Sequence, residues 1–342
     1  MPSDLRDFTR AELEEIFCRL GGKKIHAARV FTGLYREGLC AVSALDIPEN
    51  IKRPLAEHYT IAPAPSVEKL VSKIDGTVKL LFHFSDGALA ESVVLFNKGR
   101  ASACLSSQSG CACGCVFCAT GALGLRRSLS PHEIAEQFFA AASAAGGKLD
   151  SLVFMGMGEP FLNWQSVRRA ILILSDGKGC NFPQSKMTVS TVGVIPVINE
   201  LASSDLKIRL AVSLITADEV QRAELVPMNA KYPLPDVIEA ARAYCAATKR
   251  QVFFEYILFG GLNDSPAHAA KLAALVRGMD CKINLIPFNP SPKSRFAGVP
   301  PDAAKAFQKL LVAAGLRTYL RREKGSDIAA ACGQLAAKHS AS

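Results

Sequence analysis

No stretch of this 342-residue sequence approaches the ~18 consecutive apolar residues of a membrane-spanning helix, which excludes an integral membrane protein. The sequence also lacks internal repeats and low-complexity tracts. With 49% hydrophobic and 21% charged residues, it excludes a disordered or collagen-like chain. The N-terminal segment MPSDLRDFTRAELEEIF has no apolar core of a secretory signal peptide. We therefore expect a globular, cytoplasmic protein that does not contact membranes.

Acidic residues are outnumbered, with 31 Asp and Glu against 40 Lys and Arg and a net charge of +9. This excess is compatible with a polyanionic partner such as RNA, and equally with a basic enzyme that binds no nucleic acid. The chain also contains 11 cysteines. In a reducing compartment such thiols are more often buried, metal-bound or catalytic than paired in disulfides.

The spacing of apolar residues divides the chain into four parts. Residues 1–65 have the spacing of short helices, expected over 11–20, 27–37 and 51–58, and form a helical accessory domain. Residues 66–100 form a β extension, with strands expected at 77–84 and 90–96 around a turn at Ser85-Asp86-Gly87. Residues 101–320 form the main domain, and residues 321–342 form a C-terminal tail.

Strands and helices alternate along the main domain. Strands are expected at 103–106, 151–155, 186–191, 207–214, 251–258 and 282–286, and helices at 131–145, 164–174, 195–202, 234–248, 266–277 and 301–314. Six β–α units predict parallel strands joined by right-handed crossovers, with a last short strand at 316–320. The predicted fold class is α/β, either a doubly wound sheet or a barrel.

The strongest local signal is the segment GCACGCVFC at 110–118, with four cysteines within eight residues. Cys111, Cys115 and Cys118 have the spacing C-x3-C-x2-C. A structural zinc site normally has four ligands, often as two separated pairs. Three clustered thiolates can instead hold a [4Fe–4S] cluster and leave one iron open for chemistry. Strand-like alternation predicts that Cys113 points to another side and is a bystander.

Other unusual segments follow the predicted strands, at the edge where parallel α/β folds collect their ligand sites. GMGEP at 156–160 follows the second strand, Ser190 lies at the end of the third, Ser213 at the end of the fourth, and Asn289 beyond the sixth. The glycines permit close approach of the backbone to a ligand, and Glu159 can accept a hydrogen bond from an amine or a hydroxyl. By itself GMGEP is equally compatible with a turn.

The cysteine motif, with an aromatic residue before its last cysteine, resembles the radical S-adenosylmethionine (SAM) superfamily. Within it, the chain is similar to the RlmN/Cfr family of RNA adenine methyltransferases through CLSSQSGCACGCVFCATG, FMGMGEPFLN, VSTVGVIP, LVPMNAKYPL, INLIPFNP and DIAAACGQL. The resemblance implies a partial (β/α)6 barrel, one [4Fe–4S] cluster per chain and two SAM molecules consumed per methylation. The implied partners are 23S rRNA, tRNA and an electron donor such as a flavodoxin or ferredoxin, and we expect a monomer.

The resemblance also implies roles for individual residues. The cluster ligands are Cys111, Cys115 and Cys118; SAM is bound by Gly158, Glu159, Ser190, Ser213, Leu214, Ile215 and Asn289; catalysis uses Glu91, Cys104 and Cys332. In the implied reaction Cys332 takes a methyl group from one SAM. A radical made from a second SAM activates that carbon, which adds to adenine and links protein to RNA. Glu91 then takes the ring proton, and Cys104 releases the product by forming a transient disulfide with Cys332.

Several alternatives stay open. The family usually has Leu-His after Ser213, whereas this chain has Leu214-Ile215, so an imidazole contact to SAM is absent. Pro160 favours methylation of adenine C2, because the C8 branch tends toward Ala there; C8 methylation of the same rRNA adenine is the alternative. A zinc-binding, non-enzymatic RNA module is the alternative from another class. Candidate RNA-binding cations are Arg126, Arg127, Lys178, Lys293, Arg295, Arg321, Arg322 and Lys324.

Overall fold

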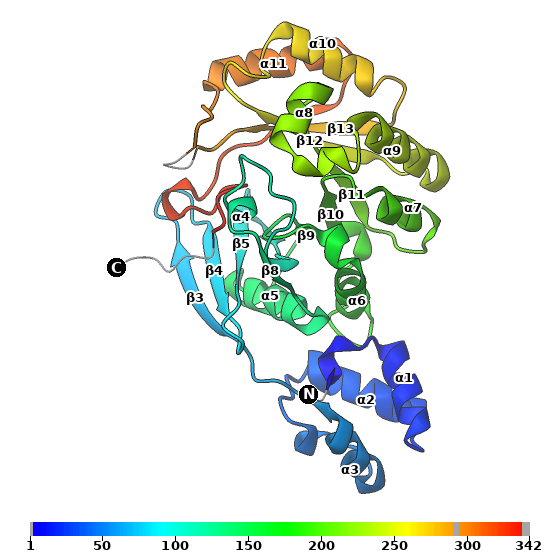
Figure 1. Cartoon of the computed structure of the whole chain (residues 1–342). Helices are drawn as coiled ribbons and strands as arrows, with labels where there is room; N and C mark the ends of the chain where they lie inside the picture. The colour runs from blue at the N-terminus through cyan, green and yellow to red at the C-terminus, as the bar shows by residue number, and fades with distance from the viewer. Residues whose placement is uncertain (1–2, 291–293, 337–342) are drawn as a thin grey trace.

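A ten-stranded β-sheet runs through the computed structural model, which describes residues 3–290 and 294–336 (Figure 1). The strand order is β14-β13-β12-β11-β10-β9-β6-β5-β4-β3. The strands are β3 (Ser66–Val71), β4 (Val78–His83), β5 (Leu89–Asn97), β6 (Arg100–Cys104), β9 (Ser151–Phe154), β10 (Met187–Thr191), β11 (Arg209–Ile215), β12 (Val252–Leu258), β13 (Cys281–Pro287) and β14 (Thr318–Leu320). Strands β6 to β14 pair in parallel, whereas β3, β4 and β5 continue the sheet in antiparallel pairs.

The predicted alternation of strands and helices is confirmed. The helices that connect the parallel strands are α5 (Pro131–Ala144), α6 (Trp164–Ser175), α7 (Ile195–Ser203), α9 (Leu234–Thr248), α10 (Pro266–Leu275) and α11 (Pro301–Ala313). The sheet remains open, because β14 and β3 form its two edges. The fold is therefore an α/β partial barrel extended by antiparallel strands. In the part of the chain that is described, no helix combines the length and apolarity needed to cross a bilayer.

The N-terminal residues form a small helical unit at one end of the molecule (Figure 1). Its elements are β1 (Ser3–Asp4), η1 (Leu5–Asp7), α1 (Arg10–Arg19), α2 (Lys24–Tyr35), η2 (Val42–Ala44), α3 (Glu49–His58) and β2 (Tyr59–Thr60). Helix α1 begins with a capping box between Thr9 and Glu12. Salt bridges from Arg6 to Glu136 of α5 (2.7 Å) and from Arg169 of α6 to Glu12 (2.8 Å) attach this unit to the main body.

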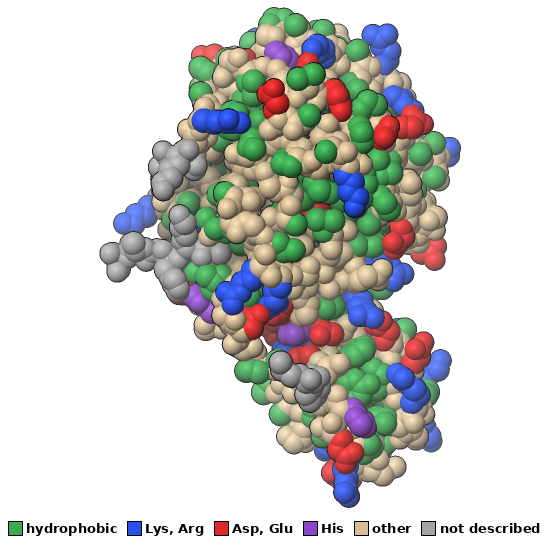
Figure 2. All heavy atoms as spheres, viewed as in Figure 1, with side chains coloured by type: hydrophobic (Ala, Val, Ile, Leu, Met, Phe, Trp, Pro, Cys, Tyr) green, Lys and Arg blue, Asp and Glu red, His purple; other side chains and the backbone are tan. Residues whose placement is uncertain are grey.

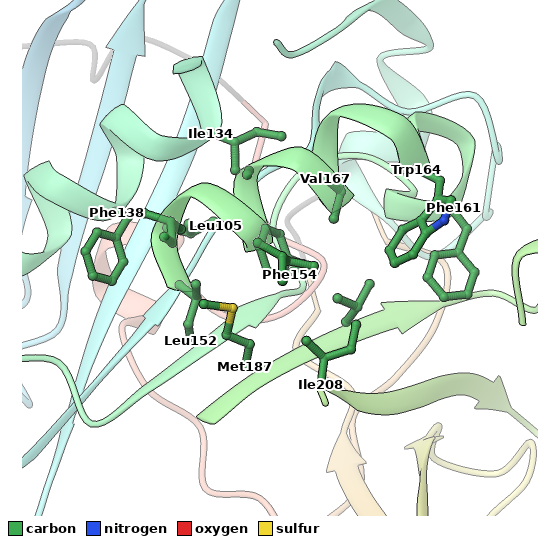
Figure 3. Close-up of a cluster of buried hydrophobic side chains, with 14 of the residues drawn as sticks. Leu105, Ile134, Phe138, Leu152, Phe154, Phe161, Trp164, Val167, Met187 and Ile208 are labelled. Atoms are coloured by element: carbon green, nitrogen blue, oxygen red, sulfur yellow. The ribbon is translucent and has the colours of Figure 1, made fainter. Parts of the chain in front are cut away.

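The core that supports the site lies between the sheet and helices α5 and α6 (Figure 3). Leu152, Phe154, Met187 and Ile208 come from or adjoin the strands, and all four are fully buried. Burial of each such side chain stabilises the fold by about 1.5–3 kcal/mol. Their close packing fixes the strands that carry the site.

Several short elements do not appear in the predicted pattern. They are β7 (Gln108–Gly110), α4 (Ala119–Ala122), β8 (Leu125–Ser128), η3 (Pro160–Asn163), η4 (Gln184–Lys186), α8 (Glu219–Leu225), η5 (Pro227–Ala230) and η6 (Ser326–Ile328). Elements of three to seven residues carry too few periodic positions to be recognised from sequence. Several of them nevertheless shape the site.

Candidate active site at the ends of the parallel strands

The cysteine-rich loop is held by a two-stranded hairpin. Strands β7 and β8 pair on either side of it, and the Cys111 N–H donates to the Gly124 carbonyl oxygen at 2.9 Å. Gly110 has φ +78°, and a Cβ there would collide with the same carbonyl. Glycine is therefore required at this position to close the loop.

All four loop cysteines line one cavity of about 200 Å³. The expectation that Cys113 points to another side is wrong, because residues 111–118 form turns rather than a strand and strand alternation does not apply. The Cys113 thiol donates to the Cys111 sulfur, which lowers the pKa of Cys111 and raises that of Cys113. Burial raises the pKa values of Cys115 and Cys118, with a further contribution from neighbouring thiols.

The donor set of the loop fits a [4Fe–4S] cluster. Such a cluster binds each thiolate through a different iron, so the sulfurs need to surround a shared space rather than converge on one point. Within residues 3–290 and 294–336, no three His, Cys, Asp or Glu side chains converge as a single-ion site requires. Cys111, Cys115 and Cys118 line one cavity and can each bind a different iron of such a cluster.

Glu159 forms a buried acidic wall of the cavity. Its side chain accepts hydrogen bonds from the backbone N–H groups of Val192 (2.8 Å) and Phe161 (3.0 Å). Burial raises the pKa of Glu159 to about 7 despite these bonds. Before it, Gly158 has φ +97°, and a Cβ there would lie 2.6 Å from the Cβ of Gln108. The glycine thus allows the backbone to pass the cysteine hairpin and position a carboxylate that can accept from an amine.

Residues at the ends of the parallel strands line the rest of the cavity. Ser190 of β10 and Ser213 of β11 share a hydrogen bond of 3.1 Å between their hydroxyl oxygens, and both line the cavity with Asn289. Ile215 also lines it, at a bulge where its φ is +70°. Leu214 does not line the cavity and packs in the hydrophobic core, because it faces the opposite side of β11. Ile215 therefore presents an apolar side chain to the cavity at the position where the family usually has a histidine.

The C-terminal tail folds back onto the cysteine loop (Figure 1). The Ala119 N–H donates to the Gly333 carbonyl oxygen at 2.8 Å, and the Thr120 hydroxyl donates to the Leu335 carbonyl oxygen at 2.6 Å. Both donors belong to α4, which begins directly after Cys118. The tail is therefore attached to the same segment that carries a candidate cluster ligand.

Cys104 and Cys332 line the same cavity, although 228 positions separate them in the sequence (332 − 104 = 228). Burial raises the pKa of Cys104 to about 12, and the neighbouring Cys332 thiol adds to the shift. Burial also raises the pKa of Cys332. Cys332 is exposed and lines the cavity. The structure thus brings the two predicted redox partners together as thiols.

Glu91 lies beside the cavity rather than in its wall. It precedes Val93 and Leu95 on β5, and these two residues do line the cavity. The Glu91 carboxylate is 1% exposed, lies 3.0 Å from the Lys79 ammonium and accepts from the Ala336 N–H at 2.9 Å. The Lys79 ammonium and the Ala336 N–H thus both bind the buried carboxylate oxygens. The docked tail therefore covers the predicted base.

Sequence reasoning did not single out four polar residues that organise the site: Lys79, Gln108, Thr120 and Arg222. Gln108 and Thr120 fall within the motif CLSSQSGCACGCVFCATG, which offered a signal for them. Lys79 pairs with Glu91, and Arg222 of α8 donates hydrogen bonds to the carbonyl oxygens of Leu214 and Val192. These last two carried no signal, because a charged residue in an isolated strand or short helix is usually solvated.

A wider cavity of about 990 Å³ adjoins the first and shares Pro287, Phe288, Asn289 and Arg321 with it. Its lining also includes the cations Lys305, Lys309 and Arg322 and the half-exposed Tyr319.

Among the other predicted cations, Arg127 pairs with Asp86 and Glu133. Lys293 lies outside the described residues. On the face shown in Figure 2, Lys and Arg are interspersed with Asp and Glu rather than gathered in one patch.

Comparisons with known proteins agree with this geometry. Residues 105–273 match the family model of the radical SAM superfamily. The chain is 39% identical over 344 residues to the dual-specificity RNA methyltransferase RlmN of Anaeromyxobacter dehalogenans, covering 98% of this chain and 92% of that protein. It is 40% identical to the probable dual-specificity RNA methyltransferase RlmN of Moorella thermoacetica, covering 97% and 96%. A crystal structure of a radical SAM methyltransferase from Sphaerobacter thermophilus superposes with a TM-score of 0.90 at 41% identity, covering 98% and 100%.

The open sheet and its cysteine loop therefore define a radical SAM enzyme. The near full-length identity narrows the class further. The chain belongs to the RlmN family of dual-specificity RNA methyltransferases.

Proposed function

We propose that this chain methylates C2 of an adenine in 23S rRNA, at the peptidyl transferase centre, and C2 of the adenine 3′ to the anticodon in tRNA. The observation that carries the proposal is the meeting of Cys104 and Cys332 in one cavity with Cys111, Cys115 and Cys118. Two thiols beside a candidate cluster site provide both a methyl carrier and the group that releases it. The family membership and the names of the relatives support the RNA substrates.

The cofactors follow from the family. Cys111, Cys115 and Cys118 would hold one [4Fe–4S] cluster, while Glu159, Ser190, Ser213 and Asn289 would contact SAM. When bound, these groups would supply the methyl group, a carbon-centred radical and an acceptor for the one electron that remains after the proton leaves C2, with two SAM molecules consumed per methylation. The protein contributes a mostly apolar cavity that positions the reacting groups.

Cys332 would carry the methyl group as a thioether and become linked through that carbon to adenine C2. Glu91, which pairs with Lys79, would accept the proton that leaves C2. The Cys104 thiolate would then bond to the Cys332 sulfur as the bond between that sulfur and the new methyl carbon breaks. The electron pair stays with the carbon, which takes a proton and completes the methyl group. A reductant must open the resulting disulfide before another cycle.

The wider cavity suits the RNA strand on either side of the target adenine. A base inside the narrow cavity must be splayed from its stack, so the adjoining nucleotides need a path outward. Lys305, Lys309 and Arg322 can contact phosphates, and Tyr319 offers a ring for stacking. We propose that residues 1–65 act as an accessory domain that grips the folded RNA, and that residues 321–342 form the catalytic tail.

The electron donor is proposed to be a flavodoxin or ferredoxin type of protein, which matches the one-electron chemistry of an iron–sulfur cluster. We propose a monomer, because an enzyme that admits a folded RNA needs open space around its cavity.

The deciding experiment uses anaerobically reconstituted protein, SAM carrying an isotopically labelled methyl group, and two RNA substrates: a 23S rRNA fragment and unmodified tRNA. Mass spectrometry of the digested RNA locates the label. We expect 2-methyladenosine in both. An 8-methyladenosine product would contradict the proposed regiochemistry, and an unlabelled tRNA would contradict dual specificity.

A further inference from the structure

A fully buried arginine, Arg222, lies behind the cysteine loop on α8. Its Nε donates to the Leu214 carbonyl oxygen at 3.2 Å, and its Nη2 donates to the Val192 carbonyl oxygen at 2.6 Å. Its Nη1 donates to the Asn229 side-chain oxygen and, at 3.4 Å, to the Tyr232 carbonyl oxygen. The four hydrogen bonds that the Arg222 side chain makes in the described structure therefore all go to uncharged oxygens.

A buried cation bonded to neutral oxygens is costly unless an opposite charge lies close by. Glu219 reaches Arg222 only indirectly: the Asn229 side-chain N–H donates to the Glu219 carboxylate at 2.8 Å. Glu219 itself is exposed, so water screens its charge. Burial lowers the pKa of Arg222 to about 10, which still leaves the guanidinium charged at neutral pH. The structure thus contains a fixed positive charge whose compensation by carboxylates is weak.

The cysteine loop is the other neighbour of this charge. The Val116 N–H donates to the carbonyl oxygen of Leu225, the last residue of α8, at 3.1 Å. Leu225 and Val226 pack in one buried cluster with Cys111, Cys113 and Cys115. An anionic group held by the loop would therefore feel the guanidinium through a dry interior, where charges interact strongly.

Arg222 is also connected to the acidic wall of the cavity. Val192 accepts from Arg222 through its carbonyl oxygen and donates through its N–H to Glu159. The same side chain thus holds the end of β11, the loop after β10 and the segment after α8 in one arrangement. Arg222 therefore helps to fix the positions of the segments that carry the cysteine loop and Glu159.

We propose that Arg222 is a positioning residue that supplies the buried positive charge for the iron–sulfur cluster and makes its reduction easier. This inference rests on the proposed function, in which Cys111, Cys115 and Cys118 hold a [4Fe–4S] cluster. Three thiolates add negative charge to the cluster, and reduction adds one electron more. A fixed cation nearby stabilises the reduced form more than the oxidised form. Binding of the cluster in turn compensates the charge that is costly in the empty protein.

The test compares Arg222→Met, which removes the charge, with Arg222→Lys, which keeps it but loses the planar fork. Arg6→Met is the matched control, because Arg6 of the N-terminal unit is also buried but pairs with Asp4 of that unit and with Glu136 of α5. Each reconstituted protein is titrated anaerobically with dithionite at set potentials, and the reduced cluster is counted by electron paramagnetic resonance. At the potential where half of the wild-type cluster is reduced, we expect Arg222→Met to show a reduced-to-oxidised ratio about tenfold lower, or ~59 mV. Arg222→Lys and Arg6→Met should stay near the wild type.

Glu219→Gln is a second variant that changes no group bonded directly to the guanidinium and keeps a side-chain oxygen to accept from the Asn229 side-chain N–H. It removes the carboxylate that opposes the Arg222 charge, so the potential should shift slightly in the opposite direction, toward easier reduction. A purely structural role for Arg222 predicts lower thermal stability without opposite signs in these two variants. If Arg222→Met fails to retain iron, the sign of the Glu219→Gln shift and the potential of Arg222→Lys decide the question.

A second readout is the rise in melting temperature when the cluster is inserted. This rise should be smaller in Arg222→Met than in the wild type, because the empty protein no longer contains an uncompensated cation. Equal potentials in the wild type, Arg222→Met and Glu219→Gln, with iron bound in all three, would overturn the inference. Wild-type protein that binds no iron would instead refute the proposed function itself, so the two failures are distinguishable.

Discussion

Thr120→Val is the perturbation that most directly tests how the catalytic tail is held. The Thr120 side chain is 3% exposed, and its hydroxyl donates to the Leu335 carbonyl oxygen at 2.6 Å. Valine has nearly the same shape but cannot donate, so the docked tail would leave this carbonyl with a lost hydrogen bond. Leaving a buried acceptor without its donor costs about 1–3 kcal/mol. The undocked tail pays no such cost, because water can solvate the carbonyl.

The expected result is an increase in the undocked population by roughly 5- to 150-fold, which is that free energy converted at 1.4 kcal/mol per factor of ten. Hydrogen–deuterium exchange of a peptide spanning residues 325–336 measures it, because the Ala336 N–H, which donates to Glu91, exchanges only when the tail opens. Thr248→Val is the matched control, since its hydroxyl donates to the Tyr244 carbonyl oxygen at 2.7 Å on α9. Unchanged exchange in Thr120→Val would refute the reasoning. Faster exchange at residues 325–336 in the control would show that the effect is not specific to the tail.

Three further predictions concern the thiols. Cys115→Ala should lose iron and all turnover, whereas Cys113→Ala should keep both, because only Cys115 is a proposed ligand. Iron and sulfide analysis of the two variants checks this. A Cys113→Ala protein without iron would assign Cys113 to the cluster. Cys104→Ala should accumulate a covalent protein–RNA adduct, visible as a shifted band on a denaturing gel, and free product at normal yield would argue against a resolving role. Because burial raises the pKa of Cys104 to about 12 and the thiolate is the nucleophile, release of the adduct in the wild type should speed up about tenfold per pH unit between about pH 7 and 9. Denaturing gels of quenched single-turnover reactions measure the rate of release. A rate that does not change with pH would show that deprotonation of Cys104 does not limit release.

Local sequence patterns were sufficient for much of the fold. The alternation of strand and helix patterns after residue 101 predicted the parallel half of the sheet, and the turn at Ser85-Asp86-Gly87 predicted the hairpin of β4 and β5. These features depend on residues that are neighbours in the chain. The short elements around the site were missed, and strand-like alternation misassigned Cys113, because the glycine-containing loop at 110–118 does not follow the backbone geometry that alternation assumes.

By itself, the sequence determined the class of the protein, its cysteine motif and the order of its elements, because spacing and turn chemistry act over a few residues. From the residues alone, Cys104, Cys332 and Glu91 would be assigned to a core or to a solvated strand, and only the resemblance to a family gave them roles. The tertiary structure decided that Cys332 and Cys104 line one cavity, that the tail docks on Thr120, and that α8, which carries Arg222, bonds the cysteine loop. Each of these contacts joins segments brought together by the register of the sheet and the return of the tail, which no local pattern encodes.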